Sequence, residues 1–192
     1  MPSGAPDTRQ KIVSREYLRD ICTRLHRDGV RIATCNGSFD LFHFGHLKFL
    51  EQARAQADVL VVGLNSDRSI KEYKDPSRPL VSQDQRAQIL AALAVVDYVH
   101  IFDETVPMPF LEVVRPQVHV NGAEYGEECI EAALVRQHGG RIHLVPKVAG
   151  LSTTELIARI KQMPAARHAA PPASLSHSPA ARCASAGRTS SR

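Results

Sequence analysis

The stretch CNGSFDLFHFGH, residues Cys35–His46, decides how this chain folds. It follows a β-branched run over Val30–Thr34 and leads into a helical pattern over Gly45–Gln56. In an open α/β sheet, a turn of this kind lies at the carboxyl end of a strand, which is where ligands bind. The free N–H groups and the positive dipole of a helix N-terminus suit a triphosphate. We therefore predict a nucleotide site at this turn.

His43 and His46 are the candidate catalytic residues of this stretch. They are three positions apart at the start of a helix, so their side chains point the same way. Two imidazoles can donate N–H bonds to phosphate oxygens on which charge builds during transfer. Gly37 gives the preceding loop its freedom, and Gly45 lets phosphates approach the backbone. The alternatives are ordinary surface histidines or a metal pair, although zinc pairs on helices usually use i, i+4 spacing and need a third ligand.

Short β-branched runs alternate with helical patterns along the chain. The run Val59–Val62 is continuously apolar, as expected of a strand covered on both faces. The alternation predicts an α/β fold, a Rossmann-like three-layer sandwich around a parallel sheet of about five strands. Capping boxes at Ser82 and Ser152 mark two helix starts. Predicted strands cover Val30–Thr34, Val59–Leu64, Tyr98–Ile101, Val118–Val120 and Ile142–Val145, and predicted helices cover Arg15–Arg27, Gly45–Gln56, Gln83–Val95, Met108–Val114, Glu127–His138 and Thr153–Gln162.

The net charge of +4 comes from one end of the chain. There are 24 basic and 20 acidic residues among 192, and residues 164–192 hold four arginines and no acid, so the remainder is formally neutral. This weakens the case for a nucleic-acid-binding face, and we expect no nucleic-acid partner. Residues 164–192 are rich in Ala, Ser, Pro and Arg and lack core-forming side chains, which predicts disorder. We expect a lead-in with one helix (1–29), a folded domain (30–163) and a disordered tail (164–192).

Several classes of protein find no support in the sequence. The four cysteines form no C-x-x-C pair, so there is no zinc or redox signal. Neither a G-x-G-x-x-G nor a P-loop motif is present, so the phosphate site is of another kind. The polar start Met1–Gln10 has no apolar signal region, and apolar runs such as Ile89–Val96 are too short to cross a bilayer. We expect a cytoplasmic protein with no membrane partner.

Two motifs resemble those of a known family. The segment Gly37–His46 resembles the G-x-F-D-x-x-H-x-G-H motif of the cytidylyltransferase-like family, and Gly150–Thr154 resembles its G-I-S-T-T element. The family places that second element at a helix N-terminus against the nucleotide phosphates, which agrees with the capping box at Ser152. The similarity spans most of Lys11–Ile160.

The resemblance implies transfer of an NMP unit from an NTP to a small phosphorylated substrate, with release of pyrophosphate. Mg²⁺ is expected on the phosphates rather than on a protein metal site, and the family commonly forms dimers, so a homodimer is expected from the resemblance alone. Expected acceptor contacts are Asp40, Lys71 and Lys74. Together with the strand ends, the motifs predict a nucleotide site formed by Gly37, Ser38, Phe39, Gly45, Arg86, Asn121, Gly122, Glu124, Lys147, Ser152, Thr153 and Thr154.

The substrates are predicted from shorter segments. Residues 11–16, 65–69 and 77–79 look most like the adenylyltransferases that make ADP-heptose from heptose 1-phosphate for bacterial envelope polysaccharide. This favours ATP as the nucleotide. The segment His46-Leu47-Lys48 is closer to glycerol-3-phosphate cytidylyltransferases, so a CTP-dependent enzyme acting on glycerol 3-phosphate or phosphoethanolamine is the alternative. The other alternative is a nucleotide-binding module without turnover, against which the intact histidine pair argues.

Two segments depart from the family patterns. The heptose subgroup usually has K-G-G-D-Y where this chain has Asn121-Gly122-Ala123-Glu124-Tyr125. Cytidylyltransferases usually have R-T-E where this chain has Lys147-Val148-Ala149, and lysine lacks the bidentate fork of arginine. These departures leave the base and the acceptor open and do not touch the histidine motif.

Overall fold

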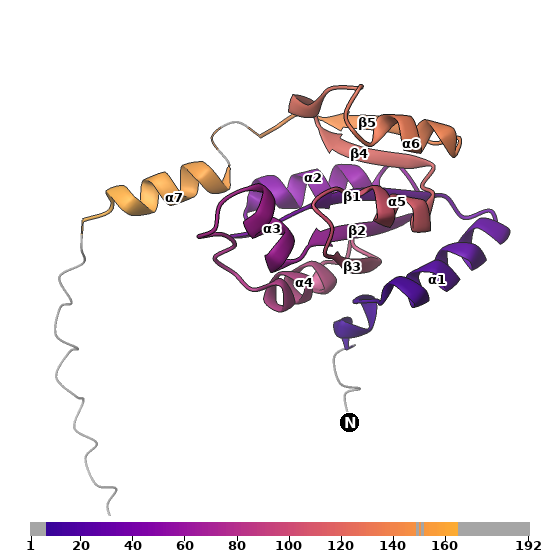
Figure 1. Ribbon diagram of the computed structural model, residues 1–192, viewed down its shortest axis with the longest axis horizontal. Coiled ribbons are helices and arrows are strands. Elements are labelled where there is room, and N and C mark those ends of the chain that lie inside the picture. The colour runs from indigo at the N-terminus through magenta and orange to yellow at the C-terminus, as the bar shows by residue number, and fades with distance from the viewer. Residues whose placement is uncertain (1–6, 149, 151, 165–192) are drawn as a thin grey trace, which may run out of the picture. The chain divides into compact units, whose positions relative to one another are not determined.

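Five parallel strands form one sheet in the computed structural model of the chain, which describes residues 7–148, 150 and 152–164 (Figure 1). The strand order is β3-β2-β1-β4-β5, so β1 lies at the centre with β2 on one side and β4 on the other. The predicted fold class is confirmed. The strands are β1 (Ile32–Gly37), β2 (Val59–Asn65), β3 (Tyr98–Phe102), β4 (Val118–Gly122) and β5 (Arg141–Val145).

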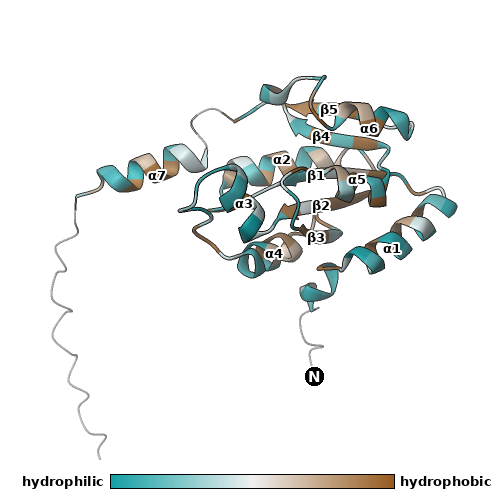
Figure 2. Cartoon of the chain, viewed as in Figure 1, coloured by the Kyte–Doolittle hydropathy of each residue, from teal (hydrophilic) through white to brown (hydrophobic). Residues whose placement is uncertain are grey.

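Helices connect the strands and cover both faces of the sheet (Figure 1). Leu50 of α2 and Leu90 of α4 belong to one buried cluster, while Leu18 of α1, Phe110 of α5 and Val135 of α6 belong to a second. Figure 2 shows hydrophobic residues concentrated at the strands and hydrophilic residues on outer helices such as α1. The α-helices are α1 (Arg15–Arg27), α2 (Phe44–Arg54), α3 (Asp67–Tyr73), α4 (Gln83–Ala92), α5 (Met108–Val114), α6 (Ala132–Gln137) and α7 (Thr153–Gln162), and the short 3-10 helices are η1 (Thr8–Lys11) and η2 (Ala123–Tyr125).

The central strands are buried on both faces, which explains the continuous apolar run in β2. Residues from Leu60 to Asn65 are all buried, and β2 pairs in register with β1, for example Val62 with Cys35. Gly63 is required at its position because a Cβ there would lie 2.8 Å from the ring of Phe110. Helix α5 therefore packs directly on the backbone of β2.

The N-terminal segment is attached to the far edge of the sheet. Ile12 forms a parallel bridge with Val99 of β3, and the Val13 amide donates to the Val99 carbonyl at 2.9 Å. The Lys11 ammonium donates to the carbonyls of Leu93 and Val96 at 3.1 and 2.7 Å, which satisfies carbonyls beyond the end of α4. Residues before β1 thus pack into the same body as the strands.

Some element boundaries differ from the predicted ones. The helix predicted from Glu127 starts only at Ala132, because Glu128 is an exposed partner of Arg136 rather than part of the helix. Helix α3 is absent from the predicted helices, and Ser66 caps it by accepting from the Ser69 amide at 3.1 Å. At the capping box of α4, the Ser82 hydroxyl contacts only the Gln85 side chain and caps no backbone amide.

The described chain divides into the units Met1–Lys161 and Gln162–Arg192. Residues 165–192, which make up nearly all of the predicted disordered tail, lie outside the described residues. Within the described part, no helix combines the length and apolarity that a membrane span needs.

Candidate active site

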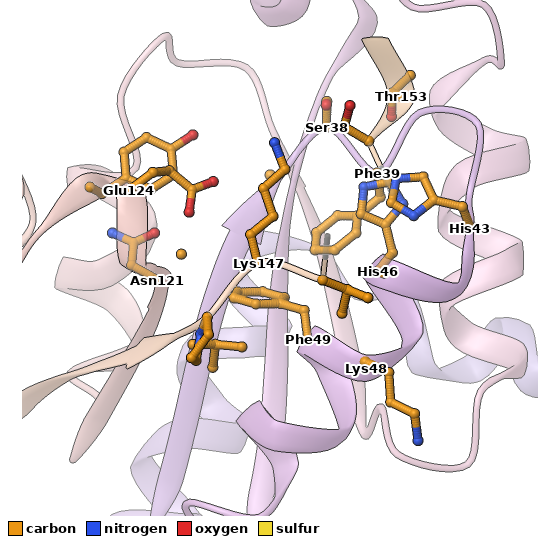
Figure 3. A pocket seen from close by; sticks show the side chains of 18 of the residues that line it. Ser38, Phe39, His43, His46, Lys48, Phe49, Asn121, Glu124, Lys147 and Thr153 are labelled. Atoms are coloured by element: carbon orange, nitrogen blue, oxygen red, sulfur yellow. The ribbon is translucent and has the colours of Figure 1, made fainter. Parts of the chain in front are cut away.

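A cavity of about 290 Å³ lies at the carboxyl ends of β1, β4 and β5 (Figure 3). Strand order reverses between β1 and β4, and such switch points are where open α/β sheets bind ligands. Thirteen residues predicted for the site line this cavity: Gly37, Ser38, Phe39, His43, Gly45, His46, Lys74, Asn121, Gly122, Glu124, Lys147, Ser152 and Thr153.

The loop between β1 and α2 has an unusual backbone. Phe39 and Leu41 both adopt left-handed conformations, with φ of 45° and 48°, which cost roughly 1–2 kcal/mol each for residues other than glycine. The Phe39 ring is only 6% exposed and belongs to the core, which helps to hold this conformation. His43 is the N-cap of α2, and its side chain makes no capping bond. The first amides of α2 therefore remain available to an anion.

His43 and His46 lie together as predicted, and their rings are stacked. The ring centroids are 3.8 Å apart with an interplanar angle of 19° (Figure 3). Phe39 and Phe42 pack against the His46 ring at 5.4 and 5.6 Å. The Nδ1 atoms of both histidines are buried and have no hydrogen-bond partner in the described part of the chain. This leaves Nε2 of each ring as the nitrogen available to a ligand.

Burial keeps both histidines neutral at physiological pH. It lowers the pKa of His46 to about 4, with smaller contributions from His43 and Lys74. Burial is also the main cause that lowers the pKa of His43. A neutral imidazole carries one N–H, so each ring can donate one hydrogen bond to a phosphate oxygen.

Two lysines bring positive charge to the cavity. The Lys74 ammonium donates to Ser38 Oγ at 3.0 Å, and burial, followed by the charge of Arg78, lowers the pKa of Lys74. Lys147 follows β5 and extends toward the middle of the cavity (Figure 3). Lys74 and Lys147 therefore give the cavity positive charge.

Helix α7 begins at the edge of the same cavity. Ser152 Oγ accepts from the Glu155 amide at 3.1 Å, which confirms Ser152 as the cap of α7, while the Glu155 carboxylate accepts from the Ser152 hydroxyl at 2.7 Å and not from the Ser152 amide. Thr153 Oγ1 donates to the Asp40 carbonyl at 2.9 Å. This hydrogen bond directly joins the two motifs identified in the sequence, although Asp40 and Thr153 lie 113 positions apart in the chain.

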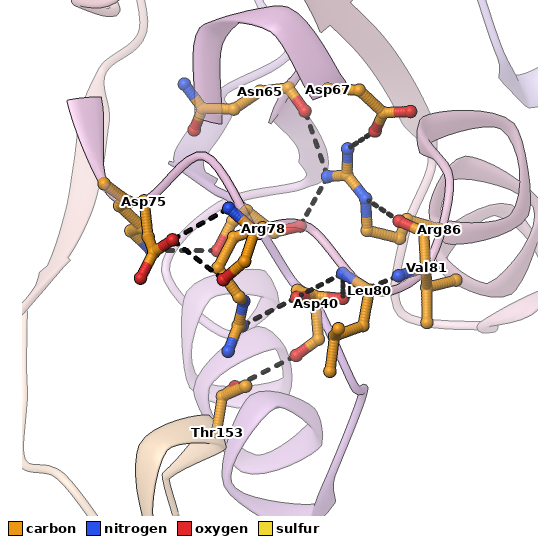
Figure 4. Close-up of polar contacts among 12 residues, drawn as sticks. Asp40, Asn65, Asp67, Asp75, Arg78, Leu80, Val81, Arg86 and Thr153 are labelled. Carbon is orange, nitrogen blue, oxygen red and sulfur yellow. Dashed lines mark hydrogen bonds and ion pairs between the residues drawn. The ribbon is translucent and has the colours of Figure 1, made fainter. Parts of the chain in front are cut away.

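Asp40 does not line the cavity, contrary to the predicted contact with the acceptor. Its carboxylate is 1% exposed and is used by other partners (Figure 4). It accepts from the amides of Leu80 and Val81 at 3.0–3.1 Å and pairs with Arg78 at 2.6 Å. The reason is geometric: left-handed turns on both sides of Asp40 direct its side chain toward the segment before α4. Asp40 ties that segment to the histidine loop.

Arg86 is also turned away from the predicted site. It is 1% exposed, and its guanidinium donates to the carbonyls of Val81, Ser38 and Asn65 and pairs with Asp67 at 2.7 Å (Figure 4). An arginine with all these bonds holds the strand ends together rather than reaching phosphates. The remaining predicted residues outside the cavity are Lys71 and Thr154, both exposed.

The sequence reasoning missed several lining residues. Phe49 and Gln52 lie one and two turns beyond Gly45 on α2, so the helical spacing was a signal that they share its face. Lys48 was not among the predicted site residues, but it lines the cavity while pairing with Glu51 at 2.7 Å. Asn36, Tyr125 and Val148 lie inside segments that the sequence analysis singled out but were not predicted as site residues, and no pattern in the sequence pointed to Val145 and Pro146.

Among the described residues, no three His, Cys, Asp or Glu side chains converge as a metal site. Glu124 is the carboxylate among the residues that line the cavity.

Sequence comparison places the chain among known proteins. It is 48% identical over 151 residues to a bifunctional protein HldE of Syntrophotalea carbinolica and 46% identical over 155 residues to one of Koribacter versatilis. These matches cover 78% and 80% of this chain but 31% and 32% of the relatives. The chain therefore spans about a third of the length of the curated relatives that it matches.

Solved structures share the fold. One is a lipopolysaccharide core biosynthesis protein of Thermoplasma volcanium, with a TM-score of 0.51 and 24% identity, covering 62% of this chain and 98% of that one. Another is a pantoate-beta-alanine ligase of Francisella tularensis, with a TM-score of 0.53 and 15% identity, covering 78% and 76%. The profile of the cytidylyltransferase-like family matches residues 34–159, a segment that begins in β1 and ends in α7 and holds both motifs of the cavity. This chain belongs to the cytidylyltransferase-like family.

Proposed function

We propose that the chain is an adenylyltransferase that transfers AMP from ATP to heptose 1-phosphate and releases pyrophosphate. The observation that carries the transfer chemistry is the pair of neutral, stacked imidazoles beside the uncapped N-terminus of α2. That arrangement supplies N–H donors for oxygens that gain charge in the transition state, which suits direct transfer between two phosphates.

In the proposed step, an oxygen of the acceptor phosphate attacks the α-phosphorus of ATP. A new P–O bond forms, the bond to the oxygen bridging the β-phosphate breaks, and pyrophosphate leaves with that electron pair. The imidazole Nε2–H groups of His43 and His46 donate to oxygens that gain charge during the displacement. Lys74, Lys147 and the N-terminus of α7 hold the phosphates in place. Mg²⁺ bound through the phosphates would neutralise part of their charge.

The choice of substrates rests on similarity. The segments 11–16, 65–69 and 77–79 resemble the ADP-heptose subgroup, and relatives named bifunctional protein HldE are 41–48% identical. These relatives are about three times as long as the matched segment, so their whole activity is not transferred to this chain. The cytoplasmic location, the homodimer and the absence of a nucleic-acid partner stay predictions.

A screen of pyrophosphate release tests the proposal. The four NTPs are each combined with heptose 1-phosphate, glycerol 3-phosphate or phosphoethanolamine, and kcat/KM is measured for each pair. ATP with heptose 1-phosphate should give the highest value. If CTP with glycerol 3-phosphate is better, the substrate assignment is wrong and the nucleotidyltransferase assignment survives. If no pair releases pyrophosphate while nucleotides still bind, the chain is a binding module.

A further inference from the structure

One wall of the cavity departs from the family pattern in its chemistry. Asn121 and Gly122 end β4, Glu124 and Tyr125 follow in η2, and all four line the cavity. Figure 3 shows Asn121 and Glu124 on the side of the cavity opposite the histidines. The resembling subgroup usually has lysine at position 121 and aspartate at 124. This chain therefore lacks a cation at the end of β4.

The orientation of the Asn121 amide is determined by a buried partner. Asn121 is 6% exposed, and its Nδ2 donates to Glu131 Oε2 at 3.2 Å. Glu131 is 5% exposed and lies just before α6. The Glu131 oxygen accepts this bond and the amide nitrogen donates it, so the amide nitrogen faces Glu131. The amide oxygen of Asn121 then faces the cavity, as Figure 3 shows.

Glu124 adds a second acceptor to the same wall. Its carboxylate lies against Gly122, where any Cβ would overlap it. The glycine therefore makes room for the longer acid that replaces aspartate. Lys147, by contrast, extends into the cavity from β5 (Figure 3). Phosphates are attracted to the lysine and repelled by Glu124, so the wall of Asn121 and Glu124 suits groups that donate hydrogen bonds.

We propose that Asn121 is a specificity-determining residue that accepts a hydrogen bond from a sugar hydroxyl of the substrates, and that Glu131 is the positioning residue that fixes its amide. The inference rests on the proposed nucleotidyl transfer. The hydroxyl belongs either to the ribose of the nucleotide or to the acceptor sugar, and both present the same chemistry to the amide oxygen.

The variants follow from the geometry. Asn121→Leu removes the acceptor and keeps the side-chain size. Glu131→Met removes the carboxylate and frees the amide to turn. Glu131→Gln keeps an oxygen that can accept from Asn121 Nδ2, so it should restore the selectivity lost in Glu131→Met. Glu127→Gln is the matched control, because Glu127 is an exposed acid nearby that does not line the cavity.

Selectivity is measured as ratios of kcat/KM in two arms. One arm compares ATP with 2′-deoxy-ATP and 3′-deoxy-ATP at fixed acceptor, and the other compares heptose 1-phosphate with glycerol 3-phosphate at fixed ATP. In one of the two arms, the preference for the substrate that carries the hydroxyl, expressed as the ratio of the two kcat/KM values, should fall roughly five- to tenfold in Asn121→Leu and Glu131→Met. This is the loss expected for one hydrogen bond. The ratio should return to the wild-type value in Glu131→Gln and stay there in Glu127→Gln. The arm that responds identifies the source of the hydroxyl.

Equal losses for every substrate, or unchanged ratios in both arms, would overturn the inference. Thermal melts show whether Glu131→Met folds. If it does not fold, Asn121→Leu still tests whether Asn121 determines the selectivity. Calorimetric binding of the same nucleotides and acceptors needs no turnover. If pyrophosphate is never released but Asn121→Leu still removes the preference in binding, the proposed function fails and the inference stands.

Discussion

Two stacked imidazoles at the start of α2 carry the proposed chemistry at the level of single residues. His43→Ala and His46→Ala should each lower kcat by roughly 10²–10³ while changing nucleotide affinity less, because the donors act on charge that develops in the transition state. Pyrophosphate release and calorimetric nucleotide binding measure the two quantities. A variant that keeps near-wild-type kcat would remove that histidine from the mechanism.

Asp40 gives a second prediction at this scale. Asp40→Asn should lower the free energy of unfolding by about 1.5–3 kcal/mol, the usual contribution of hydrogen bonds to a charged group. The loss arises because the buried charge facing Arg78 disappears. Urea denaturation measures it. The Mg²⁺ concentration for half-maximal activity should not change, since the carboxylate is occupied by protein partners.

The control for Asp40→Asn is Asp75→Asn. Asp75 lies in the same segment, where it accepts from Ser77 in an exposed setting, so its variant should be close to wild type in stability. If Asp40→Asn leaves the stability unchanged but shifts the Mg²⁺ requirement, Asp40 contacts the metal or the acceptor directly, and its structural role is wrong.

The sequence predicted most of the residues that line the cavity, but it did not predict the direction of every side chain. The spacing of His43 and His46 fixed their common direction because both lie at one helix start. Asp40 and Arg86 were misplaced because their directions depend on left-handed turns and on buried carbonyls from distant segments. Glu131 was missed because nothing in the local pattern shows that it contacts Asn121.

At the level of secondary-structure elements, strand β4, which lies between β1 and β5, contains a buried titratable group. His119 is fully buried, its Nδ1 lies 2.8 Å from Thr34 Oγ1 on β1, and burial lowers its pKa to about 3. The unfolded state takes up a proton near the ordinary pKa of about 6.5. The stabilising contribution of neutral His119 is therefore complete above pH 6.5 and is lost as the pH falls below it.

His119→Gln should flatten the dependence of stability on pH. Between about pH 6 and pH 4, wild type should lose up to about 1.4 kcal/mol per pH unit more than the variant, the slope for one proton. Urea denaturation at a series of pH values gives the slope of the free energy of unfolding against pH for each protein. The difference in the free energy of unfolding at pH 8 gives the cost of the substitution itself. Parallel curves would show that His119 is not the group that titrates.

Strand and helix identity could be predicted because both have local signals. The apolar run of β2 and the amphipathic pattern of α1 depend only on neighbours in the chain. Strands β1 and β4 were predicted to end too early. Their hydrogen-bonded pairing with neighbouring strands continues through Asn36 and Gly37 in β1 and through Asn121 and Gly122 in β4. Pairing with adjacent strands holds these residues extended, and that pairing is not visible in one segment.

For the whole molecule, the sequence suggests that activity does not depend on the C-terminal end. Truncation after Met163 should leave the melting temperature and kcat nearly unchanged, because the removed segment lacks core-forming residues. Calorimetry and pyrophosphate release provide the two measurements. A drop of several degrees would show instead that the segment packs on the domain.

The sequence predicts the type of sheet, but it does not predict the order of the strands within it. Alternating elements imply right-handed crossovers and a doubly wound sheet. They do not specify that β1 is central or that β4 crosses to its other side, which places Asn121 opposite the histidines. Tertiary packing decides this, through contacts such as Phe110 on Gly63.

The attachment of the N-terminal segment to β3 has a consequence for biosynthesis. Val13 is synthesised before β1, yet its partner Val99 is made 86 positions later. Neighbouring β1 and β2 can pair early, while Ile12 and Val13 must wait unpaired until β3 emerges, at roughly 5–20 residues per second. Although these two residues precede every strand, they are thus among the later parts to reach their final place, because they pair along β3 only after that strand has been made.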